Sequence, residues 1–181
     1  MFTPKKMFLT KGVGEHREEL QSFELALRQA GIQMLNIVSV SSIFPPGCEI
    51  ITREKGLLEV TPGQLTFCVM ARCSSKEPRR QLAASIGVAI PTDTSMYGYL
   101  SEHHSYGQTD EEAGDYAEDL AAAMLASTLG VEFDEDESWD NKRQIWKISG
   151  KIVRTMNITQ SARVSKDGKF KTVVAAAVLL P

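Results

Sequence analysis

One stretch of the chain joins a strand end to a proline-rich turn, Val40-Ser41-Ser42-Ile43-Phe44-Pro45-Pro46-Gly47. The apolar residues that precede it, from Leu35 to Val40, are typical of a β-strand. Pro45 and Pro46 have no N–H to donate to a sheet ladder, so the strand must stop before them. The two serines are therefore predicted to lie at a strand-to-loop junction, where a taut backbone can place one hydroxyl against the preceding carbonyl.

The order Ser-Ser-Ile-Phe-Pro-Pro over residues 41–46 resembles the self-cleavage site of the pyruvoyl-dependent arginine decarboxylases. In that family the motif is S-S-I-x-P-P, and the protein breaks its own Ser-Ser bond. The resemblance implies that Ser42 attacks the carbonyl carbon of Ser41 and that an ester replaces the amide. β-Elimination then divides the single domain, residues 1–181, into chains 1–41 and 42–181.

The resemblance also implies a cofactor that is made from the chain itself. Ser42 would become a dehydroalanine, lose ammonia and remain as a covalently bound pyruvoyl group at the start of residues 42–181. Its ketone would join the amine of an amino-acid substrate and act as the electron sink. The expected reaction is the decarboxylation of L-arginine to agmatine, a polyamine precursor, and CO2.

Three further segments carry the same resemblance at similar spacing, and together they cover most of the chain: residues 23–37, 84–91 and 98–102. Two alternatives stay open at this level. One keeps the pyruvoyl chemistry but takes histidine or another amino acid as substrate. The other is an unprocessed, non-catalytic binding subunit on the same fold.

Composition places the chain among ordinary globular proteins and excludes several other classes. Its 181 residues are 43% hydrophobic and 24% charged, enough for one domain with a substantial core. The net charge of −3 does not indicate the basic surface that a nucleic-acid-binding protein needs. Without a membrane-length apolar run or a signal peptide, and with three cysteines in no metal-ligand pattern, we expect a cytoplasmic protein with free thiols and no metal.

Hydrophobic periodicity predicts an α+β fold. Two amphipathic helices are expected, over residues 18–30 and 109–129, each with one apolar stripe and a glycine after its end. The second begins with a capping box formed by Thr109 and Glu112. Strands are expected over these ranges: 7–10, 34–42, 64–72, 82–90, 152–158 and 172–180. The family resemblance sharpens this to a four-layer α/β/β/α sandwich with a duplicated β-α-β-β unit.

Small residues suggest two local details of this fold. Gly12-Val13-Gly14 is typical of a turn after the first strand. Ala83-Ala84-Ser85 suggests a close approach of one sheet to another.

Decarboxylation needs a proton donor at the α-carbon, and the family resemblance assigns that role to Glu102. It follows an apolar run, where partial burial would raise the pKa of a carboxyl. His103 and His104 follow it directly. Because adjacent residues of an extended segment point to opposite faces, we interpret them as a polar loop near the site rather than as metal ligands.

Asn36 matches the family asparagine that precedes the cleavage site. Its amide could donate a hydrogen bond to the oxyanion of the acyl shift. Six residues of extended strand would separate Asn36 from Ser42 by roughly 20 Å, so one straight strand cannot bring them together. A symmetric homo-oligomer can, and the family implies a trimer or a dimer of trimers with active sites shared between subunits.

Glu24, on the first predicted helix, falls where the family has its acid for the substrate guanidinium. A carboxylate can accept two parallel hydrogen bonds from a guanidinium, which favours arginine over lysine. Archaeal members carry an aspartate at this position, so the longer glutamate is a departure that changes the depth of the pocket.

Overall fold

The strands of the computed structural model, which describes residues 3–131 and 151–181, form two sheets. The first sheet has the order β2-β5-β9-β1-β4, and the second has the order β3-β7-β6-β8. The strands of the first sheet are β1 (Lys6–His16), β2 (Asn36–Ser39), β4 (Glu49–Ile51), β5 (Leu65–Ser75) and β9 (Phe170–Leu180). Those of the second are β3 (Ile43–Phe44), β6 (Gln81–Pro91), β7 (Gly98–Tyr106) and β8 (Ile152–Arg163).

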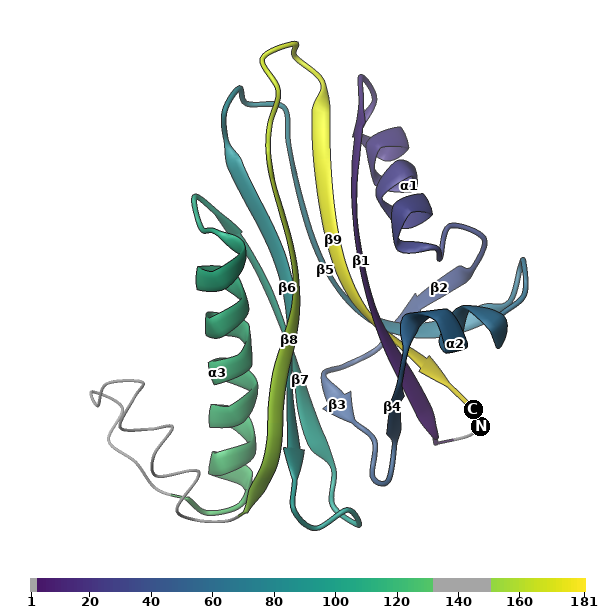
Figure 1. The fold of residues 1–181 in the computed structure, drawn as a ribbon, viewed down its shortest axis with the longest axis vertical. Helices are drawn as coiled ribbons and strands as arrows, with labels where there is room; N and C mark the ends of the chain where they lie inside the picture. The colour runs from purple at the N-terminus through teal and green to yellow at the C-terminus, as the bar shows by residue number, and fades with distance from the viewer. Residues whose placement is uncertain (1–2, 132–150) are drawn as a thin grey trace.

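Helices cover the outer faces of both sheets, which gives four layers (Figure 1). Helices α1 (Glu19–Ala30) and α2 (Arg53–Leu58) lie beside the first sheet, and α3 (Asp110–Thr128) lies on the second. The predicted α/β/β/α layering is confirmed. The duplicated β-α-β-β unit stays a prediction.

Strand β9 shows why these layers hold together. Its side chains alternate between two apolar clusters, because successive residues of a strand point to opposite faces. Val173, Ala175 and Ala177 pack between the two sheets, whereas Val174 and Ala176 pack under α1 and α2. A strand buried on both faces reads as a continuous apolar run, and this run is the centre of the fold.

The predicted turn at Gly12-Val13-Gly14 is wrong, because β1 runs through it without interruption to His16. These glycines serve helix packing instead. A Cβ on Gly12 would lie 2.1 Å from the carbonyl oxygen of Ala26, and one on Gly14 would lie 2.1 Å from that of Ser22. The missing side chains let the backbone of α1 rest directly on the strand.

Strand β6 uses small residues on both of its faces. Ala84 belongs to the apolar cluster between the sheets, where β6 lies close to β5 and β9, as expected from Ala83-Ala84-Ser85. Its neighbours alternate to the other face, toward α3, where a Cβ on Gly87 would lie 2.0 Å from the carbonyl oxygen of Ala117. Small residues therefore also allow a close approach of helix and sheet.

The helix ends follow the sequence closely. Gly31 adopts a left-handed conformation with φ 83° after α1, and Gly130 does so with φ 65° after α3. The capping box of Thr109 and Glu112 is formed at the start of α3. Helix α2 is not predicted by the sequence pattern, since six residues are too few to show a period. Its Arg53 donates hydrogen bonds to the last carbonyls of α1, at Gln29 and Ala30.

Candidate active site

The serine pair lies where the chain crosses from one sheet to the other. Strand β2 pairs with β5 of the first sheet, and the N–H of Val40 extends that pairing to the Cys68 carbonyl. Three residues later Ile43 pairs with Tyr99 of β7 in the second sheet. The predicted strand over 34–42 is shorter than expected, because β2 covers only residues 36–39. Residues 40–42 form a bridge to β3, which begins at Ile43 in the other sheet.

Backbone hydrogen bonds fix both carbonyls around the serine bond. The N–H of Ile43 donates to the Ser41 carbonyl at 2.8 Å, and the N–H of Leu100 donates to the Ser42 carbonyl at 2.9 Å. Among the described residues other than glycine, only Arg79 has a positive φ, so Ser42 has a negative one. A hydrogen bond across one residue of negative φ is an inverse γ-turn, which is common at strand ends. The expected taut backbone is therefore a relaxed turn.

The two prolines end the second short strand as predicted. The N–H of Cys48 donates to the Pro45 carbonyl at 3.2 Å, which closes a four-residue turn. Pro46 occupies its second position and Gly47, with φ 65°, its third. This is the residue pattern of a type II turn. The turn returns the chain to the first sheet, where β4 pairs with β1.

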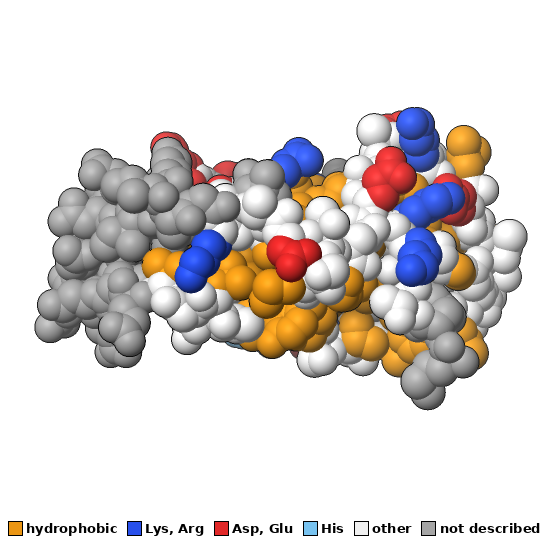
Figure 2. All heavy atoms as spheres, turned by 90° about the horizontal axis from the view of Figure 1, so that it is seen from below, with side chains coloured by type: hydrophobic (Ala, Val, Ile, Leu, Met, Phe, Trp, Pro, Cys, Tyr) orange, Lys and Arg blue, Asp and Glu red, His pale blue; other side chains and the backbone are white. Residues whose placement is uncertain are grey.

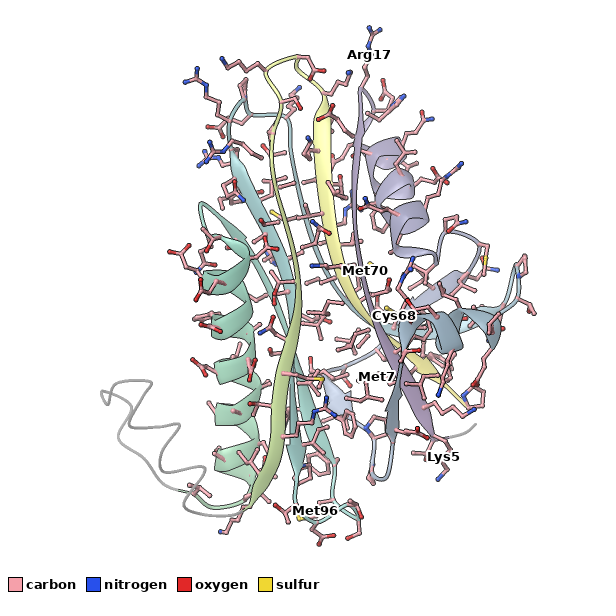
Figure 3. All side chains as sticks on the ribbon, in the orientation of Figure 1. Lys5, Met7, Arg17, Cys68, Met70 and Met96 are labelled. Atoms are coloured by element: carbon pink, nitrogen blue, oxygen red, sulfur yellow. The ribbon has the colours of Figure 1, made fainter. Side chains whose placement is uncertain are left out.

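Glu102 lies on β7, two residues beyond the Leu100 that holds Ser42. Two strand residues span about 7 Å, so Glu102 lies close to the part of β7 that is bonded to Ser42. Leu100 is buried between the sheets, and Glu102 points to the same face because side chains alternate along a strand. There the N–H of Met70, on β5, donates to its carboxyl. Figure 3 labels Met70 and Cys68 midway along the molecule, on the strand that faces this site.

Burial raises the pKa of the Glu102 carboxyl above its ordinary value. The hydrogen bond from Met70 and the positive charge of His104 lower that pKa, but burial is the largest effect. The side chain nevertheless remains accessible to solvent in the single chain. Glu102 is thus a carboxyl that keeps its proton to higher pH than a typical glutamate and can still reach a small molecule.

His103 and His104 do not form the predicted loop, because both belong to β7. The expectation that they point to opposite faces is confirmed. His103 contacts Tyr116 of α3, with 4.4 Å between ring centroids, and bonds Gln108 at 2.7 Å. His104 lies on the opposite face, the same face as Glu102, and its charge lowers the pKa of Glu102. No group of three possible metal ligands occurs in residues 3–131 and 151–181.

The single chain does not bring Asn36 or Glu24 to the serine bond. The Asn36 amide donates to the Gly63 carbonyl at 2.7 Å, at the far end of β2, whereas Ser42 is bonded to the second sheet. Glu24 lies on α1 and pairs with Arg28, with 2.6 Å between the charged atoms. Both side chains are open to a neighbouring molecule. Their roles in the site stay predictions.

An open pocket of about 410 Å³ lies beside Ser41 and Ile43. Its walls are mostly apolar. They come from the residues before β1, the bridge, the proline turn and strands β5 and β9 of the first sheet: Thr3, Pro4, Val40, Pro45, Pro46, Phe67 and Leu179. Figure 2 views the end of the molecule where β3 and β4 join and shows hydrophobic side chains gathered in the middle of that surface. Phe67 and Leu179 were not predicted as site residues, because in sequence they are ordinary strand residues.

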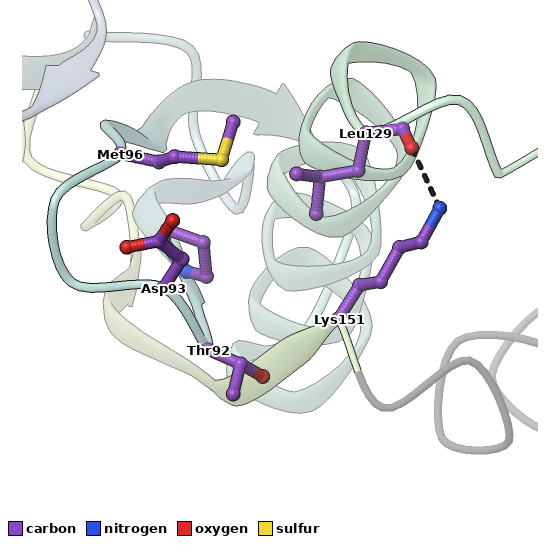
Figure 4. A pocket seen from close by; sticks show the side chains of 6 residues that line it. Thr92, Asp93, Met96, Leu129 and Lys151 are labelled. Carbon is purple, nitrogen blue, oxygen red and sulfur yellow. Dashed lines mark hydrogen bonds between the residues drawn. The ribbon is translucent and has the colours of Figure 1, made fainter.

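A second pocket of about 400 Å³ lies between the end of α3 and the loop after β6 (Figure 4). Thr92, Asp93 and Met96 line it from the loop, and Lys151 closes it by donating to the Leu129 carbonyl at 2.9 Å. It contains none of the residues that the sequence predicts for the site. The candidate active site is therefore the bridge with Ser42 and Glu102.

A layered α/β/β/α sandwich with Ser41 and Ser42 at the crossing between its sheets, and with a carboxyl of raised pKa on the neighbouring strand, is compatible with a decarboxylase that uses a pyruvoyl cofactor. Residues 6–181 match the family model described as pyruvoyl-dependent arginine decarboxylase. The chain belongs to the pyruvoyl-dependent arginine decarboxylase family.

Curated relatives match along almost their whole length. A protein of Chloroherpeton thalassium named "Probable pyruvoyl-dependent arginine decarboxylase" is 61% identical over 180 residues, 99% of each chain. The pyruvoyl-dependent arginine decarboxylase of Nitrosopumilus maritimus is 56% identical over 97% of this chain and 96% of its own. "Pyruvoyl-dependent arginine decarboxylase 2" of Methanosarcina mazei is 52% identical over 98% and 97%.

The pKa of Glu102 can be measured directly by NMR titration of ¹³C-labelled glutamate. We expect a pKa of Glu102 above the ordinary glutamate value, and a further rise in His104→Gln, because the positive charge of His104 favours the carboxylate. His103→Gln, on the opposite face, is the matched control and should leave the pKa of Glu102 unchanged. An ordinary pKa for Glu102, or equal shifts in the two variants, would contradict this electrostatic assignment.

Proposed function

We propose that this protein cleaves itself between Ser41 and Ser42 and then decarboxylates L-arginine to agmatine and CO2. The observation that carries the proposal is the placement of the Ser41–Ser42 bond at the crossing between the sheets, about two strand residues from Glu102. The names of the relatives support arginine as substrate. No feature of the site favours histidine.

Self-cleavage requires only groups that the chain supplies, plus one water. The Ser42 Oγ adds to the Ser41 carbonyl carbon, the C–N bond breaks, and the hydroxyl proton passes to the freed nitrogen. Loss of the Ser42 Cα proton then expels the Ser41 carboxylate and leaves dehydroalanine. Dehydroalanine, an enamine, tautomerises to its imine, which takes up one water and releases ammonia. Chain 1–41 then ends in a carboxylate, and chain 42–181 begins with the pyruvoyl group.

The surroundings of Ser42 fit such a group. Its side chain is half-buried, its carbonyl is fixed by Leu100, and the adjacent pocket opens to solvent. The pyruvoyl ketone supplies an electron sink for the bond between the α-carbon and the carboxylate. Glu102, with its raised pKa, delivers the proton that replaces CO2, and the Met70 N–H orients its carboxyl. The apolar pocket walls suit the methylene stem of arginine.

In this proposal, the residues that bind the substrate guanidinium come from a neighbouring subunit. Glu24 and Asn36 lie away from Ser42 in one chain, and both are exposed. A symmetric homo-oligomer, a trimer or a dimer of trimers, would bring them from one subunit to the Ser42 of the next. The protein would work in the cytoplasm, where agmatine feeds polyamine synthesis. No helix in the described part of the chain is long and apolar enough to cross a membrane.

Processing is tested by intact mass spectrometry. The wild-type protein should give chains 1–41 and 42–181, the second blocked by a ketone. Ser42→Ala should stay whole because it lacks the nucleophile. Ser39→Ala, an exposed serine of the same segment, is the control and should cleave normally. Wild-type protein that remains uncut on long incubation would refute self-processing.

Glu102→Gln should cleave itself and bind arginine but decarboxylate it slowly. Loss of a general acid typically costs about 10²–10⁴-fold in rate. The measurement is CO2 release from carboxyl-labelled arginine in cleaved protein. Glu77→Gln, which alters an exposed glutamate paired with Arg80, should leave the rate unchanged. Near-normal turnover of Glu102→Gln would place the proton donor elsewhere.

A shared site predicts complementation between two inactive variants. An Asn36→Ala chain folded together with a Ser42→Ala chain should recover part of the activity, since some interfaces then pair an intact Asn36 with an intact residue 42. Each variant alone should be inactive. An active monomer in sedimentation would refute the shared site.

A further inference from the structure

We propose that the backbone N–H of Ile43 is the hydrogen-bond donor that stabilises the negative charge on the Ser41 carbonyl oxygen during self-cleavage. This inference rests on the proposed function, because it concerns the first step of the processing reaction. It assigns the role of oxyanion donor to a main-chain group of the same subunit.

The geometry of the γ-turn carries the inference. The Ile43 nitrogen lies 2.8 Å from the Ser41 carbonyl oxygen. Donors that stabilise an oxyanion lie about 2.7–3.1 Å from the position that the oxyanion takes. The oxyanion forms on this same oxygen, and the N–H of Ile43 already donates to it before the attack. Ser42 is the central residue of this turn. The hydrogen bond between Ile43 and Ser41 therefore spans the residue that carries the nucleophile.

The pairing of β3 explains why this N–H is available. The N–H of Leu100 bonds the Ser42 carbonyl, so residues 42 and 100 form a hydrogen-bonded pair of the antiparallel ladder. Ile43 and Tyr99 are the next pair along. Hydrogen-bonded and non-hydrogen-bonded pairs alternate in such a ladder, so the N–H of Ile43 points away from β7. It is directed instead at the carbonyl oxygen of Ser41.

The chemistry of the acyl shift places charge where this donor lies. As the Ser42 Oγ adds to the Ser41 carbonyl carbon, the electron pair of the C=O bond moves onto the carbonyl oxygen. When the C–N bond breaks, that pair returns to form the ester carbonyl, and the proton of the hydroxyl ends on the nitrogen. A donor already in position stabilises the intermediate without reorganisation.

No other donor to this oxygen comes from the described residues of the same chain. The Asn36 amide, the donor suggested by sequence, is bonded to Gly63 at the far end of β2. Any residue except proline at position 43 supplies the N–H, and the prolines of the motif begin two residues later. The inference therefore predicts that a proline at position 43 would impair cleavage.

The test removes the N–H and leaves the side chain. Ile43 is replaced by its α-hydroxy acid, which exchanges the N–H for an ester oxygen, and the time course of cleavage is followed by intact mass spectrometry. We expect cleavage between Ser41 and Ser42 to slow by about 10²–10³-fold, the usual effect of losing one oxyanion donor. Hydrolysis of the new ester would give a fragment 1–42, which mass distinguishes from 1–41.

Two side-chain variants complete the test. Ile43→Val keeps the N–H and should cleave like the wild type. Ile43→Pro removes it in a short edge strand that tolerates proline, and should remain largely uncut. Circular dichroism and thermal melting verify that each variant is folded. Cleavage of the ester variant within threefold of the wild-type rate would overturn the inference while leaving self-processing intact, and an uncut wild type would overturn both.

Discussion

The structure depends on the packing of two sheets whose facing surfaces are made of small and medium apolar side chains. Ala84 and Ala175 lie in the interface between the sheets, and Val173 and Leu100 complete it. This packing holds the edges of β5 and β7 close enough for three residues, 40–42, to cross from one to the other. At this crossing, backbone hydrogen bonds hold the carbonyls of Ser41 and Ser42. Glu102 lies near them on β7.

The same packing sets the electrostatics of the site. Glu102 faces the gap between the sheets, where lost solvation raises the pKa of its carboxyl. The backbone of Met70, in the opposite sheet, acts on the same carboxyl and lowers its pKa, but burial is the larger effect. The raised pKa of Glu102 therefore follows from its place beside the facing sheet.

Main-chain groups control the serine bond more than side chains do. The N–H groups of Ile43 and Leu100 hold the carbonyls on either side of Ser42, and neither depends on the identity of its own side chain. Asn36 and Glu24 lie elsewhere in the single chain. The proposed site thus has two parts. One subunit contains the processing centre, and the next subunit supplies the residues that bind the substrate.

Local signals in the sequence predicted the two long helices, their ends, most of the strands and the motif at Ser41-Ser42. These features depend on side-chain periodicity and on residue types at fixed spacing. Through its resemblance to a family, the sequence also predicted Glu102 as a site residue, and the structure shows that its pKa is raised. Tertiary structure alone decided that residues 36–44 divide between two sheets, and that Gly12 and Gly14 make room for a helix rather than form a turn. Strand partners and close contacts arise between segments far apart in the chain, so no local pattern records them.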